Sequence, residues 1–143
     1  MDKIATCQNG VTLYEIPVGK TQELTIIASD EYSCSRITVN VGEEYEIWCD
    51  SNQRWKDSFL PSTTPDGFFN ILASIAGKRV PKTKCFCLCG VYDLNDSTGF
   101  AIGSDKTFTI PPGCSELSFF PNDTKGFHEN NSGSITINVR RLM

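Results

Sequence analysis

The feature that most constrains this chain is a series of short segments rich in β-branched and aromatic residues, each set between turn-forming residues. In the last segment Ile135, Ile137 and Val139 alternate with polar residues, which predicts one face in a core and one in water. The predicted strands are 24–28, 37–41, 45–49, 85–94, 106–110, 117–120 and 134–139. This pattern favours an all-β fold, a two-sheet antiparallel β-sandwich.

One segment departs from the strand pattern. Asp66 is a suitable N-cap, and Phe68, Leu72 and Ile75 then recur at helical spacing before Gly77. We therefore expect one short helix in this part of the chain.

A length of 143 residues favours a single domain. We assign residues 22–143 to the β-sandwich and residues 1–21 to an N-terminal extension. Within the extension, the stretch from Val11 to Ile16 suits an extra strand or a linker, and the pattern does not decide between them.

Charge and hydropathy exclude two classes of partner. The net charge is −4 and the 13 Lys and Arg residues are scattered, so no basic surface for nucleic acid is expected. Membrane insertion is not expected either, because no apolar run approaches the ~18–20 residues of a membrane span. The first twenty residues contain no apolar signal-peptide core, which predicts a protein that is cytoplasmic or released without a visible signal peptide.

The cysteines are interpreted mainly as free thiols. There are seven, an odd number, so they cannot all pair within one chain. Cys85, Cys87 and Cys89 alternate along a predicted strand, a spacing unlike that of a structural zinc knuckle, so we expect them to pack in a core.

The sequence gives little support for a catalytic function. His128 is the only histidine, so a Ser–His or Cys–His nucleophile would have to use it, and it is predicted to be an exposed residue of a polar loop. The adjacent Glu43 and Glu44 follow a turn, where a solvated acidic edge is expected instead of a glycosidase pair. We predict no enzymatic activity.

The loop from residue 121 to 134 is rich in hard oxygen donors. Asp123, Asn130 and Asn131 offer carboxylate and amide oxygens of the kind that Ca²⁺ prefers among its 6 to 8 ligands. The alternative is that Asp, Asn, Gly and Ser are the ordinary residues of a tight loop.

The spacing of Asp123, Phe127, Asn130–Asn131 and Ser132–Gly133–Ser134 resembles the calcium loop of the PA-I galactophilic lectin family, bacterial β-sandwich lectins that bind galactose through a metal ion. Similarity extends over about residues 22–139, with an insertion of roughly residues 68–84. The resemblance implies a sandwich of the galactose-binding-domain or jelly-roll type, with Ca²⁺ as cofactor. The implied metal ligands are Trp55 and Phe127, through their main-chain carbonyls, with Asp123, Asn130 and Asn131.

A second stretch, Pro65–Asp66–Gly67, resembles the family's other sugar-contacting loop. The sugar-binding residues that the resemblance implies are Trp55, Thr64, Pro65, Asp66, Asp123, Thr124, Phe127 and Asn130. The chain departs from the family where Thr64 replaces a His and where no Gln lies near Gly67, so the identity of the glycan stays open.

The function implied is a calcium-dependent lectin specific for galactose or galactosides, in which sugar hydroxyls complete the calcium shell. A single sugar site has roughly millimolar affinity, so the resemblance also implies a homo-oligomer that binds galactose-containing glycans through several sites. Two alternatives stay open: a calcium-stabilised β-sandwich that binds a protein, and the glycan-targeting module of a larger protein.

Overall fold

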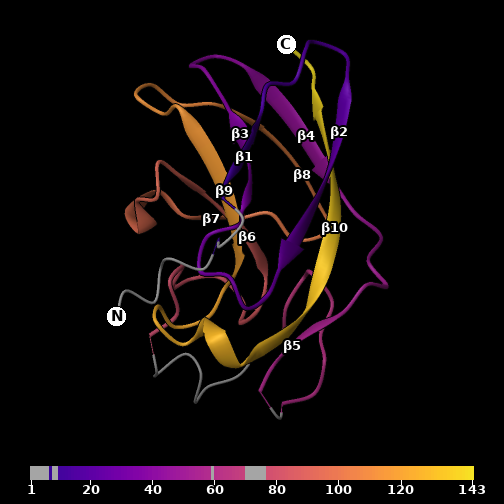
Figure 1. Cartoon of the computed structure of the whole chain (residues 1–143), viewed down its shortest axis with the longest axis vertical. Coiled ribbons are helices and arrows are strands. Elements are labelled where there is room, and N and C mark those ends of the chain that lie inside the picture. The colour runs from indigo at the N-terminus through magenta and orange to yellow at the C-terminus, as the bar shows by residue number, and fades with distance from the viewer. Residues whose placement is uncertain (1–6, 8–9, 59, 70–76) are drawn as a thin grey trace.

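The structure, a computed structural model, describes residues 7, 10–58, 60–69 and 77–143. It has two packed sheets (Figure 1). The first contains, in spatial order, β1 (Thr12–Tyr14), β3 (Ser35–Thr38), β9 (Glu116–Pro121), β6 (Leu88–Tyr92) and β7 (Phe100–Ala101). The second contains β2 (Thr21–Ile27), β10 (Asn131–Arg141), β4 (Glu44–Trp48) and β8 (Asp105–Thr109), and β5 (Trp55–Asp57) pairs with the start of β10.

The all-β prediction is confirmed, and every predicted strand overlaps a strand of the structure. The sequence patterns missed β5 and β7, which are only 3 and 2 residues long and too short to show alternation. For Val11 to Ile16 the structure shows a strand: β1 runs parallel to β3, whereas the other strand pairs are antiparallel. The division of the chain at residue 22 stays a prediction.

The predicted helix is wrong where the structure describes it. Asp66 lies in a turn, and Phe68 forms an isolated antiparallel bridge with Cys85, which fixes extended backbone where the first helical turn was expected. Residues 70–76, the rest of the predicted helix, lie outside the described residues. In the part of the chain that is described, the helical elements are two 3₁₀ turns, η1 (Asp96–Thr98) and η2 (His128–Asn130).

Two hydrophobic clusters lie on opposite faces of the first sheet. The larger one fills the space between the sheets and includes Ile135, Ile137 and Val139, all fully buried as their alternation predicts. The smaller one lies on the outer face of β6 and β9 and contains Tyr32, Cys87, Cys89, Val91 and Phe120. These two strands are therefore covered on both faces, so the segments outside β6 and β9 form part of the fold.

The cysteine prediction is corrected at one pair. Cys7 and Cys34 form a disulfide, which joins the extension to the segment before β3. The other five cysteines form no disulfide, and Cys85, Cys87 and Cys89 are buried as expected of core residues. Across the described segments, no helix has the length and apolar character needed to span a bilayer.

Candidate functional site

The 123–131 loop, the connection from β9 to β10, carries most of the predicted calcium ligands. Asp123 begins it directly after the buried Asn122, and Asn131 ends it as the first residue of β10. The loop folds back on itself because the Asn131 Nδ2 donates to Asp123 Oδ2 at 3.1 Å. The other Asp123 oxygen, Oδ1, accepts from the Thr124 backbone N–H at 2.7 Å. The structure thus brings together two of the predicted ligands.

One hydrogen-bonding atom of the Asn131 side chain has no partner among the described residues. The side chain is buried, and its Nδ2 also donates to the Ala28 carbonyl at 3.1 Å, so the amide cannot turn over without losing two bonds. Its Oδ1 is buried with no hydrogen-bond partner among the described residues. Leaving such an acceptor unsatisfied costs about 1–3 kcal/mol, so a ligand that supplies a positive charge would be stabilised here.

Two residues with carboxylates, Asp123 and Asp57, are neighbours of Asn131. Asp57 in β5 is the cross-strand partner of Asn131. Burial raises the pKa of Asp123 to about 6, and the negative charge of Asp57 adds to this rise. Burial also raises the pKa of Asp57. The charge in this region is therefore incompletely balanced by the protein itself.

The remaining loop ligands lie at the surface. The Asn130 side chain is exposed, and its carbonyl accepts from the Ser58 N–H at 3.1 Å. Phe127 directly precedes η2, and its ring is 62% exposed. Within the described residues there is no cluster of three or more His, Cys, Asp or Glu side chains that could hold a metal ion. A metal site here would combine at most two carboxylates with amide and main-chain oxygens.

Trp55 is placed differently from the other predicted ligands. Its ring is 1% exposed and packs in the core, with the indole N–H donating to the Phe86 carbonyl at 3.0 Å. Its own carbonyl accepts from the Thr63 N–H at 2.8 Å. The ring is therefore inaccessible to a sugar. Asp57, at the end of the same strand, and Ser58, directly after it, are the residues that face the loop.

The predicted second sugar loop is a fixed turn. The Asp66 carboxylate accepts from both the N–H and the hydroxyl of Ser104, at 2.8 and 3.1 Å. The Pro65 carbonyl accepts from the Leu88 N–H at 2.8 Å, and the Thr64 carbonyl from the Gly67 N–H at 3.0 Å. These bonds tie the turn to β6 and to the segment before β8, and they use both oxygens of Asp66.

Sequence reasoning missed the polar groups beneath the loop. His128, predicted to be exposed, is 1% exposed, and burial together with the nearby positive charge of Arg79 lowers its pKa to about 3. Glu31 is also buried and accepts the Gly126 backbone N–H through Oε1. Glu31 and Asp57 are separated from the loop by many residues, and no local motif marks them.

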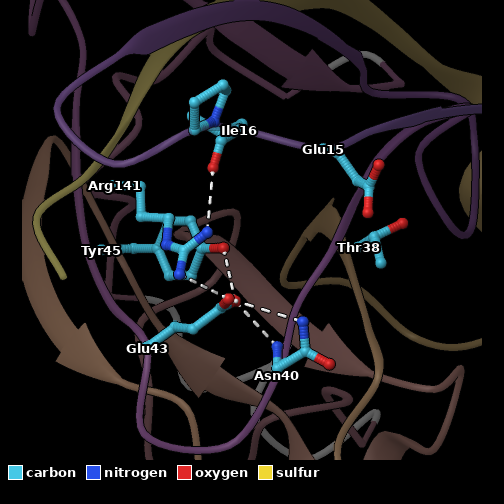
Figure 2. Close-up of a pocket in the computed structure, with 8 residues that line it drawn as sticks. Glu15, Ile16, Thr38, Asn40, Glu43, Tyr45 and Arg141 are labelled. Atoms are coloured by element: carbon cyan, nitrogen blue, oxygen red, sulfur yellow. Dashed lines mark hydrogen bonds and ion pairs between the residues drawn. The ribbon is translucent and has the colours of Figure 1, made fainter.

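A second polar pocket, the Glu43 pocket, lies at the other end of β10. It encloses about 230 Å³ and is lined by Glu15, Ile16, Pro17, Thr38, Asn40, Glu43, Tyr45 and Arg141 (Figure 2). Glu43 Oε1 accepts from the Asn40 N–H and the Tyr45 hydroxyl, each at 2.8 Å. Its Oε2 forms an ion pair with Arg141 at 2.9 Å. Burial alone would raise the pKa of Glu43, but the hydrogen bonds and the Arg141 charge together lower it.

Comparisons with known proteins bear on the fold. No protein-family model and no curated protein matches the chain. A solved structure described as the EclA N-terminal domain, a PllA-like lectin, is similar with a TM-score of 0.59 and 17% identity, over 83% of this chain and 94% of that one. The chain has a lectin-like β-sandwich fold. At this identity the similarity carries the fold only, so the ligands must be argued from the residues of this chain.

Proposed function

We propose that this chain is a calcium-dependent lectin without catalytic activity, whose site is the 123–131 loop. The observation that carries the proposal is the buried Oδ1 of Asn131, which has no partner among the described residues, in a side chain whose Nδ2 bonds to Asp123; the pKa of Asp123 is raised to about 6. A buried amide oxygen without a partner among the described residues, next to a partly buried carboxylate with a raised pKa, is the arrangement expected of a cation site.

The residues fit calcium better than a transition metal, because all the donors are hard oxygens. Asp123 and Asn131 would hold the ion through side-chain oxygens, joined by the carbonyl of Phe127 and the amide of Asn130. For the upstream donor we favour Asp57 over Trp55, because Asp57 faces Asn131 and the Trp55 carbonyl is bonded to Thr63. When bound, calcium would supply coordination positions for a pair of vicinal sugar hydroxyls.

The same loop would contact the sugar. Asn130 and Phe127 are exposed beside the buried Asp123–Asn131 pair, so they form the accessible rim of the site. Asp123, with Thr124 and Asn130, would hydrogen-bond the hydroxyls, and the ring of Phe127 would cover an apolar face of the sugar. A galactoside is the proposed ligand, and a homo-oligomer would raise its weak single-site affinity by avidity.

The lack of catalytic activity is supported by His128. The ring is buried, and its pKa is lowered to about 3, so it is neutral and out of contact with solvent at neutral pH. A general base needs to reach its substrate and to have a pKa near the working pH.

A second candidate is a calcium-stabilised module that binds a protein. The observation favouring it is the Thr64–Asp66 turn, where Ser104 takes up both Asp66 oxygens and leaves that carboxylate bonded within the fold. Such a module would use calcium only to order the loop.

Calorimetry of the intact chain separates these functions. Galactose is titrated into protein loaded with calcium and into protein held in chelator, with glucose as the control sugar. A lectin of this type gives saturable heat with galactose only when calcium is present. Calcium binding with thermal stabilisation but no response on a broad glycan array would support the protein-binding module instead. Galactose heat that is unchanged in chelator would refute the calcium-bridged mechanism.

A further inference from the structure

Arg79 lies beneath the 123–131 loop, in a polar layer on the outer face of the first sheet. Its side chain is 1% exposed, although its charge makes burial costly. The guanidinium carbon lies 3.6 Å from the Phe120 ring centroid and 4.6 Å from that of Tyr32. Nε and Nη2 each donate to one oxygen of Asp96 at 3.0 Å. The side chain is thus held in one orientation by a paired hydrogen bond and by two rings.

The remaining donors of Arg79 point to the loop and to the segment that supports it. The backbone N–H donates to the Asp123 carbonyl at 3.2 Å. Nη1 donates to the Glu31 carbonyl at 2.5 Å and lies 3.4 Å from the His128 Nε2. Glu31 in turn accepts the Gly126 N–H. Arg79 therefore contacts the loop at Asp123 and at His128, and it fixes the residue that holds Gly126 between them.

Neighbouring residues hold Arg79 at this position. The buried Asn122 side chain accepts from the Val80 N–H at 2.9 Å and donates to the carbonyls of Val80, Thr83 and Lys84. Lys78 forms an isolated antiparallel bridge with Thr124. The described end of the insertion, residues 77–84, thus runs alongside the base of the loop, and the backbone at Arg79 cannot move independently of Asp123.

We infer that Arg79 is a positioning residue that fixes the 123–131 loop in its ligand-binding form, and that the insertion places it there. The part of this inference that concerns calcium affinity rests on the proposed function, while the part that concerns loop order does not. The role depends on geometry as well as charge, because the planar guanidinium makes the paired bond to Asp96 while Nη1 reaches Glu31. A lysine has one charged nitrogen and cannot make both.

If only the charge of Arg79 mattered, replacing Arg79 would have the opposite effect on calcium binding from the one that a positioning role predicts. A buried positive charge near a cation site repels the cation, so removing that charge without disturbing the loop would strengthen calcium binding. A positioning role predicts weaker binding when Arg79 is replaced, because the oxygens of Asp123 and the loop lose their alignment. The sign of the change therefore distinguishes the two roles.

The test compares Arg79→Met and Arg79→Lys with Arg36→Met. Arg36 is a matched control, because it also donates to one backbone carbonyl, that of Ser33, and pairs with one carboxylate, that of Glu116. Calcium alone is titrated by calorimetry, and amide exchange at Gly126 is measured by NMR in chelator. We expect both Arg79 variants to bind calcium about 10–100-fold more weakly, the range found when an outer support of a metal site is lost. We also expect faster exchange at Gly126, with neither change in Arg36→Met.

Asp96→Asn provides a second, indirect variant, because an asparagine oxygen can still accept one of the two Arg79 bonds although the buried guanidinium loses its carboxylate partner, so its free energy of unfolding is measured alongside. It should weaken calcium binding and speed Gly126 exchange to a smaller extent. Equal or tighter calcium binding together with unchanged Gly126 exchange would overturn the positioning role. If the unaltered protein binds no calcium, the proposed function fails, and Gly126 exchange alone then decides the role of Arg79.

Discussion

A partly buried carboxylate lies near each end of β10, and the protein shifts the pKa values of the two carboxylates in opposite directions. At the carboxyl end, Glu43 has Tyr45, Asn40 and Arg141 as partners, and together they lower its pKa. At the amino end, about 30 Å away along the strand, the pKa of Asp123 is raised to about 6, and the adjacent Asn131 Oδ1 has no partner among the described residues.

This difference is the reason for proposing the ligand site at the amino end of β10. The Glu43 pocket stabilises the fold, because Arg141 also donates to the Ile16 carbonyl (Figure 2) and to the Met143 carbonyl. Arg141 thereby joins the N-terminal segment to the C-terminal one. In the 123–131 loop the pKa of Asp123 is raised and the Asn131 Oδ1 has no partner among the described residues, and we propose that a cation from outside the chain satisfies them. Loss of a group should therefore affect folding at one end and binding at the other.

The largest expected effect is that of Asp123→Asn on calcium binding. Removing a buried ligand charge should weaken the affinity at least ~100-fold, equivalent to about 2.7 kcal/mol. Stability in chelator should stay the same or rise, since an unbalanced buried charge is removed. Calorimetric titration and urea unfolding measure the two quantities. Normal calcium affinity in this variant would remove Asp123 from the site.

The next effect is a pH dependence of the metal-free protein. Because the folded pKa of Asp123 is about 6 and the unfolded value about 3.8, the folded state binds the proton more tightly. Stability should therefore rise as the pH falls from 7 to 5, by no more than about 1.3 kcal/mol, and by less after allowance for screening by water. Urea unfolding in chelator at each pH measures it, and Asp123→Asn should lack the rise. A fall in stability over this range in the unaltered protein, absent in the variant, would contradict the burial of Asp123.

Whether a feature can be predicted from the sequence depends on how far apart along the chain its interacting residues lie. The apolar alternation of Ile135, Ile137 and Val139 predicts the long strand because it is a local pattern. The turn and bridge at Asp66 and Phe68 look like a helix start in sequence, because the partners that hold them, Ser104 and Cys85, are distant along the chain.

The same distinction between local and long-range interactions applies to the candidate site. Asp123 and Asn131 are eight residues apart, so one short stretch of sequence, together with its family resemblance, marks them as possible ligands. Asp57, Glu31 and Arg79 reach the loop only through strand pairing and long-range hydrogen bonds. Their residue types give no local signal of this role, and the family resemblance points to the aromatic Trp55 instead of Asp57.

A smaller effect is expected at the Glu43 pocket. Glu43→Gln should lower the free energy of unfolding by about 1–2 kcal/mol at pH 7, as expected when hydrogen bonds to a charged group are weakened. Calcium affinity should not change. Because the folded pKa of Glu43 lies below its ordinary value of 4.5, its contribution is present above pH 4.5 and is lost as the pH falls through the folded pKa. Urea unfolding at pH 7 and pH 3 should show the difference between variant and parent shrinking in acid; an unchanged difference would argue against the ion pair.

The smallest effect should come from Phe127→Ala. The ring is largely exposed, and only the carbonyl is proposed to hold calcium, so stability should change by less than ~0.5 kcal/mol. Calcium affinity should stay within about threefold, equivalent to ~0.65 kcal/mol. Galactose affinity should fall modestly if the ring covers the sugar. A large loss of calcium binding in this variant would show that the ring orders the loop, contrary to its exposure.

The most direct test of the account is a crystal structure of the protein grown with calcium and measured for anomalous scattering. The account predicts one calcium peak within about 2.3–2.6 Å of an Asp123 oxygen and of Asn131 Oδ1. An Asn131 Oδ1 that accepts a hydrogen bond from water or protein instead, with no calcium near Asp123 at millimolar supply, would contradict it.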